Sequence, residues 1–204
     1  MASSSASANS LIFQGHTALA IPAAEGYLLV DPKKCQGCLS CMMACSLVHH
    51  GSVNLSLARI QVTHNHLANF PDDAIIAICR QCVDPLCMKA CPEGALHVDS
   101  GHGNVRTVDA ENCIGCGECV RACPFPIARS VWNHEAGLAE KCDLCANTPF
   151  WKETGGPAGK KACIGICPLH AIGFTDKAPI QEGDSGYLVN LRGKAWEQFG
   201  LTTD

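Results

Sequence analysis

The sequence predicts an α+β fold in which small sheets and short helices surround four groups of four cysteines. The 16 cysteines of the 204-residue chain fall into groups of related spacing, and short apolar segments typical of strands lie between them. Aromatic residues make up only 5% of the chain, so side-chain packing alone is not expected to fill the interior. The cysteine groups are therefore expected to organise the core.

The third group, within residues 113–124, carries the most specific signal. Its sequence, CIGCGECVRACP, has the spacing C-x2-C-x2-C-x3-C followed by proline, with cysteines Cys113, Cys116, Cys119 and Cys123. In this bacterial motif the thiolates bind a [4Fe–4S] cluster, and the fourth cysteine typically binds a second cluster. Gly115 and Gly117 allow the close backbone approach and the unusual dihedral angles that such a loop needs.

The other three groups are variants of this motif. The first has the same spacing, but Ser46 replaces the final proline; it consists of Cys35, Cys38, Cys41 and Cys45. The second has a wider gap after its second member; it consists of Cys79, Cys82, Cys87 and Cys91. The fourth is divided by the long segment 146–162; it consists of Cys142, Cys145, Cys163 and Cys167.

Four elements are expected in the first half of the chain. A short apolar run predicts a strand at Tyr27–Val30. Because no proline interrupts it, the segment Ser40–His50 is expected to form a helix, with Gly51 as its C-cap. Alternating and continuous apolar patterns predict strands at 57–63 and 74–79.

Further strands are expected in the second half. Residues 95–108 are expected to form a hairpin around a Gly-rich turn. Another strand is expected at 127–134, after the helix-breaking segment Pro124–Pro126. The run CPLHAIGF at 167–174 repeats the pattern of CPEGALHV at 91–98, which predicts a further turn and strand and indicates two related halves.

Both ends of the chain are expected to lie outside the cysteine-rich domain, which spans residues 25–175. Residues 1–24 are expected to be a leader, either derived from an expression tag or disordered, because they begin with a Ser/Ala-rich stretch. Residues 176–204 are expected to form a C-terminal extension that ends in a helix around Ala195–Phe199. Trp196 in that helix could anchor on the body of the protein or on a partner.

Charge and hydropathy exclude several classes of partner. The formal net charge is −4, and four oxidised clusters with their thiolates would take it to about −12. Nucleic-acid binding needs a basic footprint, so no nucleic acid is expected as a partner. No apolar run reaches the roughly 18 residues of a membrane span. Since no secretory signal is recognisable either, no direct membrane span is expected and the cytoplasm is the expected location.

Two interpretations are open for four histidines near the first and second groups. They are either solvated, or protonatable donors near a cluster that tune its potential. These histidines are His49, His50, His64 and His66. Lys160 and Lys161 are likewise either a solvated pair or positive charges at a docking edge. Trp132 is expected to pack in the core.

Four interpretations of the cysteine groups compete. Disulfides would require strained rings across the C-x-x-C pairs. Structural zinc uses two C-x2-C pairs separated by a loop, which suits the fourth group but not the evenly spaced first and third groups. An enzyme with chemistry at a cluster needs an iron with an open position, whereas all four groups are complete. Electron transfer through closed clusters fits every group, so no catalytic residue is expected.

The whole pattern resembles the four-cluster ferredoxin-type subunits of molybdopterin and tungstopterin oxidoreductases. The resemblance covers residues 25–175 and is carried by CRQCVDPLCMKACPEGA, by CIGCGECVRACPFP and by KCDLC with ACIGICP. The segment CSLVHHGSVNLSLARIQV is most similar to subunits paired with tungsten aldehyde oxidoreductases. The resemblance implies two interleaved bacterial-ferredoxin-like modules related by a pseudo-twofold axis. The first cysteine group would pair with the fourth in one module, and the second with the third in the other.

Together with the crossover of each fourth cysteine, the resemblance implies one set of ligands for each of four [4Fe–4S] clusters. One set is Cys35, Cys38, Cys41 and Cys167. The next is Cys142, Cys145, Cys163 and Cys45. A third is Cys79, Cys82, Cys87 and Cys123, and a fourth is Cys113, Cys116, Cys119 and Cys91.

A subunit of this kind would relay single electrons through its clusters and would not be catalytic alone. The resemblance implies a catalytic partner with pterin-bound tungsten or molybdenum, of which an aldehyde-oxidising enzyme is the expected kind. A second redox partner would be a flavin subunit, a ferredoxin or another copy of this chain. The alternative function is a free-standing polyferredoxin electron carrier.

Overall fold

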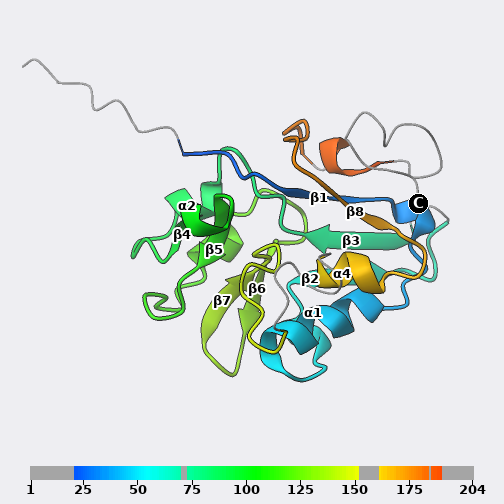
Figure 1. Cartoon of the computed structure of the whole chain (residues 1–204), viewed down its shortest axis with the longest axis horizontal. Helices are drawn as coiled ribbons and strands as arrows, with labels where there is room; N and C mark the ends of the chain where they lie inside the picture. The colour runs from blue at the N-terminus through cyan, green and yellow to red at the C-terminus, as the bar shows by residue number, and fades with distance from the viewer. Residues whose placement is uncertain (1–20, 70–72, 152–160, 184, 190–204) are drawn as a thin grey trace, which may run out of the picture.

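The computed structural model describes residues 21–69, 73–151, 161–183 and 185–189. Over these residues the fold is α+β, with four two-stranded antiparallel sheets joined by short helices and loops (Figure 1). The expected fold class is therefore confirmed. No helix within the described ranges is long and apolar enough to cross a membrane.

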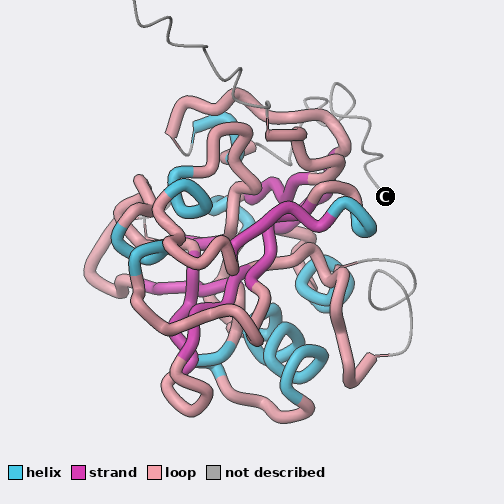
Figure 2. The backbone as a smooth tube through the Cα atoms, turned by 90° about the vertical axis from the view of Figure 1, so that its left-hand side faces the viewer, coloured by secondary structure: helices cyan, strands magenta, loops and turns pink. Residues whose placement is uncertain are grey.

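Short elements alternate along the chain, and none is longer than the first helix. The strands are β1 (Tyr27–Val30), β2 (Ile60–His64), β3 (Ala74–Ile78), β4 (Leu96–Asp99), β5 (Val105–Val108), β6 (Ser130–Asn133), β7 (Leu138–Lys141) and β8 (Ile172–Thr175). The α-helices are α1 (Ser40–His50), α2 (Leu86–Lys89), α3 (Glu118–Arg121) and α4 (Ala162–Ile166). Figure 2 shows how much of the backbone between them is loop.

The first and last strands pair with each other, which interleaves the two halves of the chain. β1 and β8 are antiparallel, with Tyr27 opposite Thr175 and Val30 opposite Ile172. The other sheets pair strands that follow one another: β2 with β3, β4 with β5, and β6 with β7. α1 packs against α4, and α2 packs against α3. Helices α1 and α4, which carry cysteines of the first and fourth groups, therefore lie together on the right of Figure 1.

The helix predicted at Ser40–His50 is confirmed with the same bounds. It ends at Gly51, which adopts the left-handed conformation with φ 71° and donates its N–H to the carbonyl of Leu47 at 2.9 Å. This is the predicted C-cap. The helix buries Cys41 and Cys45 on its inner face, so its packing presents two thiols to the interior.

Three predicted elements, the strand β1, the strand β3 and the hairpin β4–β5, are also confirmed. The strand predicted at 57–63 begins only at Ile60. The reason is a local cap, because the side chain of Asn54 accepts the N–H of Ser56 at 3.1 Å and stabilises a 3₁₀ turn at Leu55–Leu57.

The strand predicted at 127–134 is shorter, and its partner was not predicted. β6 covers only Ser130–Asn133, because the backbone before it turns around a cysteine: the N–H of Arg129 donates to Cys123 Sγ at 3.3 Å. β7 has the sequence LAEK, which lacks a clear apolar alternation. It is a strand because it pairs with β6, with Lys141 opposite Ser130, and this depends on tertiary packing.

Packing continues on both sides of residues 25–175. Ala24 is buried next to Tyr27, and Tyr187 covers the same strand from the C-terminal side. The Tyr187 hydroxyl donates to the carbonyl of Arg80 at 2.8 Å, which links the extension to the second cysteine group. Residues 1–20 of the expected leader, and the helix expected around Ala195–Phe199 with Trp196, lie outside the described residues.

Cysteines take much of the place that apolar side chains have in other cores. The main buried cluster combines aliphatic side chains of β1, β2 and β3 with cysteines from three of the four groups: Cys41, Cys45, Cys79, Cys142 and Cys163. Metal ligands buried at these positions would link separate segments of chain through the middle of the molecule.

We expect the chain to be largely unfolded without bound iron, because ligation at thiols in the core couples binding free energy to folding. Iron is removed with a chelator under anaerobic conditions, and circular dichroism is compared before and after. A native-like spectrum of the iron-free chain would contradict this expectation.

Candidate iron–sulfur sites

The structure gathers the sixteen cysteines, all free thiols, into four sets that each combine two cysteine groups. Three sets line one cavity each. Site 1 is lined by Cys35, Cys38, Cys41 and Cys167. Site 3 is lined by Cys79, Cys82, Cys87 and Cys123. Site 4 is lined by Cys91, Cys113, Cys116 and Cys119. Site 2 consists of the remaining cysteines, whose charges interact: Cys45, Cys142, Cys145 and Cys163.

Helix packing explains why each set draws on two groups. α1 carries Cys41 and Cys45 one turn apart, so these two thiols enter different sites. α4 packs against α1 and brings Cys163 to site 2, while Cys167, the residue after α4, reaches site 1. The packing of α2 against α3 mixes the second and third groups in the same way.

Backbone N–H groups point at sulfur atoms in three of the sites. The N···S distances are 3.3 to 3.4 Å, and the pairs are Gly37 with Cys35, Arg59 with Cys45, Arg129 with Cys123, and Ala171 with Cys167. A donor aimed at sulfur favours the thiolate over the thiol, and such bonds also adjust the potential of a bound cluster. The loops are therefore shaped for ligation.

The two glycines singled out in residues 113–124 have the expected backbone. Gly115 and Gly117 have φ values of 68° and 74°, in the left-handed region. A side chain at Gly115 would also collide with the carbonyl oxygen of Gly137. The left-handed backbone favours glycine at both positions, and the lack of space also requires glycine at Gly115. The loop of site 4 therefore depends on these two glycines.

Several of the more deeply buried thiols resist ionisation in the absence of a cation. Burial, together with the charges of Cys35 and Cys167, raises the pKa of Cys41 to about 12. Burial likewise raises the pKa of Cys82 and of Cys145 to about 11. Four thiolates in one buried space become stable only when positive metal ions sit between them, which is what iron in a cluster supplies.

The spacing of the ligands argues against a single metal ion. A structural zinc ion needs four ligand atoms about 2.3 Å from one point. Within the described residues, no three side chains of His, Cys, Asp or Glu converge closely enough to share one ion. Three of the four cysteine sets line one cavity each, and a [4Fe–4S] cluster would place one thiolate on each of its four irons.

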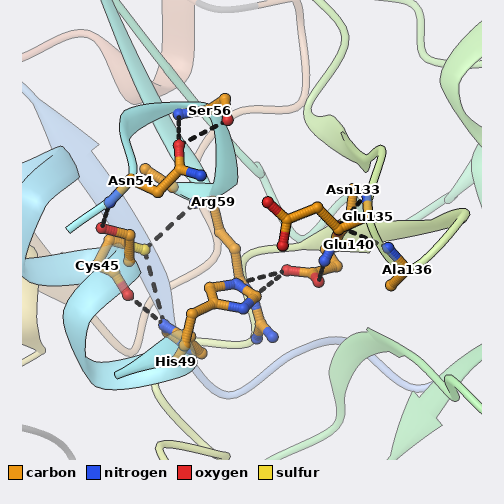
Figure 3. A network of polar contacts seen from close by, with 12 residues as sticks. Cys45, His49, Asn54, Ser56, Arg59, Asn133, Glu135, Ala136 and Glu140 are labelled. Carbon is orange, nitrogen blue, oxygen red and sulfur yellow. Dashed lines mark hydrogen bonds and ion pairs between the residues drawn. The ribbon is translucent and has the colours of Figure 1, made fainter. Parts of the chain in front are cut away.

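A buried polar network lies beside site 2 (Figure 3). His49 has its Nδ1 2.8 Å from the carbonyl oxygen of Cys45 and 3.8 Å from its sulfur, and its Nε2 lies 3.1 Å from Asp143 Oδ1. Arg59 donates to Asp143 Oδ2 at 2.6 Å, and its backbone N–H donates to Cys45 Sγ. Asp143 also accepts the N–H of Cys145 at 3.0 Å, so the network fixes two ligands of site 2.

The solvated interpretation is wrong for His49, which is only 7% exposed. Its burial opposes a charged ring, but the hydrogen bonds with Asp143 and Cys45 outweigh this effect and raise the pKa of His49 to about 9. Burial would raise the pKa of Asp143, whereas His49 and Arg59 lower it below its ordinary value. Sequence could not indicate this burial, because Asp143 lies far away along the chain.

Lys141, which the sequence did not single out, reaches into site 3. The residue is 4% exposed, and its Nζ lies 3.7 Å from Cys87 Sγ. Burial opposes its charge, but the thiols of Cys79 and Cys87 outweigh burial and raise the pKa of Lys141. The only available signal was the pair of opposite charges that flank Cys142 in the motif KCDLC.

The other histidines lie closer to the surface. His50 contacts Glu140 Oε2 at 3.0 Å, so it joins the edge of the network at site 2. His64 contacts Asp73 at 3.1 Å, and its Nδ1 lies 3.0 Å from that of exposed His66. These contacts do not reach a cysteine.

The remaining side chains singled out by sequence have structural partners. Half-buried Lys161 lies with its Nζ 5.5 Å from the centre of the Phe174 ring, whereas Lys160 is outside the described residues. Half-buried Trp132 packs on the apolar cluster around Leu96 and Cys119, so the expectation for this residue is confirmed.

Solvent reaches the four sites unequally. Of the sixteen cysteines, the two classed as exposed are Cys38 in site 1 and Cys116 in site 4. Sites 2 and 3 contain only buried and half-buried cysteines. Any exchange of electrons with another protein is therefore easiest at sites 1 and 4.

Comparison with known proteins gives two family matches. The model of the 4Fe-4S dicluster domain matches residues 73–177. The model of a 4Fe-4S binding domain matches residues 32–47. Together these matches include all four cysteine groups.

Curated relatives align along most of their own length. The thiosulfate reductase electron transfer subunit PhsB of Salmonella typhi is 33% identical over 162 residues, which cover 76% of this chain and 78% of PhsB. The aliphatic sulfonate oxidoreductase polyferredoxin-like subunit of Pyrococcus furiosus is 39% identical over 136 residues, covering 67% of this chain and 75% of that subunit. The electron transport protein HydN of Escherichia coli is 31% identical over 174 residues, covering 76% of this chain and 91% of HydN.

We expect the variant His49→Ala to destabilise the holoprotein by about 1–3 kcal/mol, because it leaves the buried carboxylate of Asp143 short of a hydrogen bond. The measurement is the midpoint of urea unfolding under anaerobic conditions, monitored by the visible absorption of the clusters. His66→Ala is the matched control, since His66 is exposed, and it should leave the midpoint unchanged. Equal midpoints for both variants would show that the buried network contributes nothing.

Proposed function

Because the chain belongs to the 4Fe-4S dicluster family of electron-transfer iron–sulfur proteins, we propose that it is the electron-transfer subunit of an oxidoreductase complex. The observation that carries this proposal is the completeness of the four sites, each with four cysteines. When bound, a [4Fe–4S] cluster supplies one-electron transfer. A site with four thiolates leaves no iron open to a substrate, so the residues of this chain hold and tune the redox groups and do not transform a substrate.

We further propose that each of sites 1 to 4 holds one [4Fe–4S] cluster. The placement of the four cysteines of sites 1, 3 and 4 around one cavity each supports this assignment. For site 2 the support is the interaction among its thiols and the network that orients two of them. The protein then provides a row of shielded sites between two accessible ends at Cys38 and Cys116.

We propose that the partner at one end is a catalytic subunit with pterin-bound tungsten or molybdenum. An aldehyde-oxidising enzyme is the proposed kind, and its support is the resemblance of the segment CSLVHHGSVNLSLARIQV to subunits paired with tungsten aldehyde oxidoreductases. The names of two relatives, subunits of a thiosulfate reductase and of an aliphatic sulfonate oxidoreductase, support a catalytic partner without deciding its substrate. The other end would serve a flavin subunit, a ferredoxin or a second copy of this chain.

A free-standing polyferredoxin carrier is the second candidate, and HydN, which is named an electron transport protein, favours it. Gentle anaerobic purification of the natural protein separates the two. A stoichiometric complex with a large pterin-containing protein would support the function as a subunit. A chain that carries its clusters but purifies without such a protein would contradict it.

We expect Cys167→Ala to impair the cluster of site 1 rather than that of site 2, although Cys167 belongs to the fourth cysteine group. The readout is the set of EPR signals and midpoint potentials of the reduced protein. Cys163→Ala is the matched comparison, because its thiol lies in site 2. The assignment is wrong if both variants lose the same signal.

A further inference from the structure

Residues Lys141–Asp143 cross from site 3 to site 2 and carry opposite charges into them. The Lys141 side chain enters site 3, with Nζ 3.7 Å from Cys87 Sγ. Cys142 belongs to site 2, and the 2%-exposed Asp143 accepts the N–H of Cys145 there at 3.0 Å. A buried cation and a buried carboxylate are therefore separated by a single ligand residue.

The surroundings of site 3 add to its positive charge. Arg106 is fully buried and donates its Nε to the carbonyl of Cys82 at 3.1 Å. Among the described residues that line the cavity of site 3, the one carboxylate belongs to Asp84, whose side chain is 68% exposed and pairs with Lys89.

Site 2 lacks this excess of positive charge. Arg59 contacts Asp143 at 2.6 Å and Glu140 at 3.5 Å, and His49 contacts Asp143 at 3.1 Å. Two basic side chains therefore face two carboxylates, and neither sign of charge is in excess. Burial differs in the same direction, because three of the four cysteines at site 2 are buried whereas Cys79 is the one buried cysteine at site 3. Better solvation of site 3 would also favour the higher potential there.

Sites 2 and 3 adjoin each other through one buried side chain. Gln81, which is 0% exposed, lies between Cys79 and Cys82 and donates its Nε2 to the carbonyl of Cys142 at 2.8 Å. Cys79 and Cys142 also belong to the same buried cluster. A difference in charge between these sites therefore acts on neighbouring electron carriers.

We propose that Lys141 and Asp143 create a step in reduction potential between the two interior sites, with the higher potential at site 3. This inference rests on the proposed function, in which each site holds a cluster. Reduction adds one negative charge, which a cation in contact with a ligand stabilises and a nearby carboxylate opposes, both more strongly in a buried setting.

The step involves one electron and no proton or bond. A cluster in site 2 would give up one electron, and a cluster in site 3 would accept the same electron. At equilibrium the electron is held on the side of Cys79 and Cys87, next to Lys141. Site 3 would then hold an electron between exchanges with partners at sites 1 and 4.

The test is a redox titration of the holoprotein followed by EPR, with Lys141→Gln as the main variant. We expect one midpoint to fall, with at least a ten-fold change in the ratio of oxidised to reduced sites at fixed potential, which is about 59 mV for one electron. Lys141→Arg keeps the charge and should keep the midpoint. Lys89→Gln removes an equal charge from a side chain that is 52% exposed, and should move no midpoint by this amount.

The midpoint that moves must be the one that Cys82→Ser also alters, because Cys82 lies in site 3. The inference is overturned if Lys141→Gln keeps its iron and moves no midpoint, or moves one that Cys82→Ser leaves unchanged. If Lys141→Gln loses iron, the test uses Asp143→Asn instead. In that variant a midpoint other than the one that Cys82→Ser alters should rise. If no such midpoint rises, the inference is overturned. Failure of the proposed function looks different, since the unmodified chain would then lack four redox-active clusters.

Discussion

The gathering of four thiols at each of four sites is the constraint on which the rest of the structure depends. The sheets have only two strands each, and the helices α2, α3 and α4 are one turn or little more, so neither could form a stable core alone. The buried cluster that joins them contains cysteines where other proteins place aliphatic side chains. Iron bound at these positions would connect segments that are distant in sequence.

The same constraint explains which features could be predicted from the sequence. Cysteine spacing, the proline-free segment of α1 and the glycine at its end are local properties, and each corresponds to a local feature of the structure. The hairpin β4–β5 could be predicted for the same reason, because its turn and both strands lie in one short stretch of sequence. The assignment of ligands to four clusters, residue by residue, came from the family resemblance together with the crossover of each fourth cysteine, and it stays a prediction.

The features that sequence reasoning missed depend on contacts between distant segments. β7 is a strand only through its pairing with β6, and His49 is buried only because Asp143 and Arg59 fold over it. Lys141 looks like an ordinary charged residue until the second cysteine group is placed beside it. These residues set the charge around the sites, so the chemistry of the ligands is predictable while their electrostatic tuning is not.

The central claim is that each of the four sites holds a [4Fe–4S] cluster, and the most direct measurement is the metal content of the anaerobically purified protein. Iron, acid-labile sulfide and zinc are determined per chain, and EPR is recorded on the reduced sample. The account predicts roughly sixteen iron atoms and as many sulfides per chain, with signals of interacting clusters. Stoichiometric zinc, or iron without acid-labile sulfide, would contradict it.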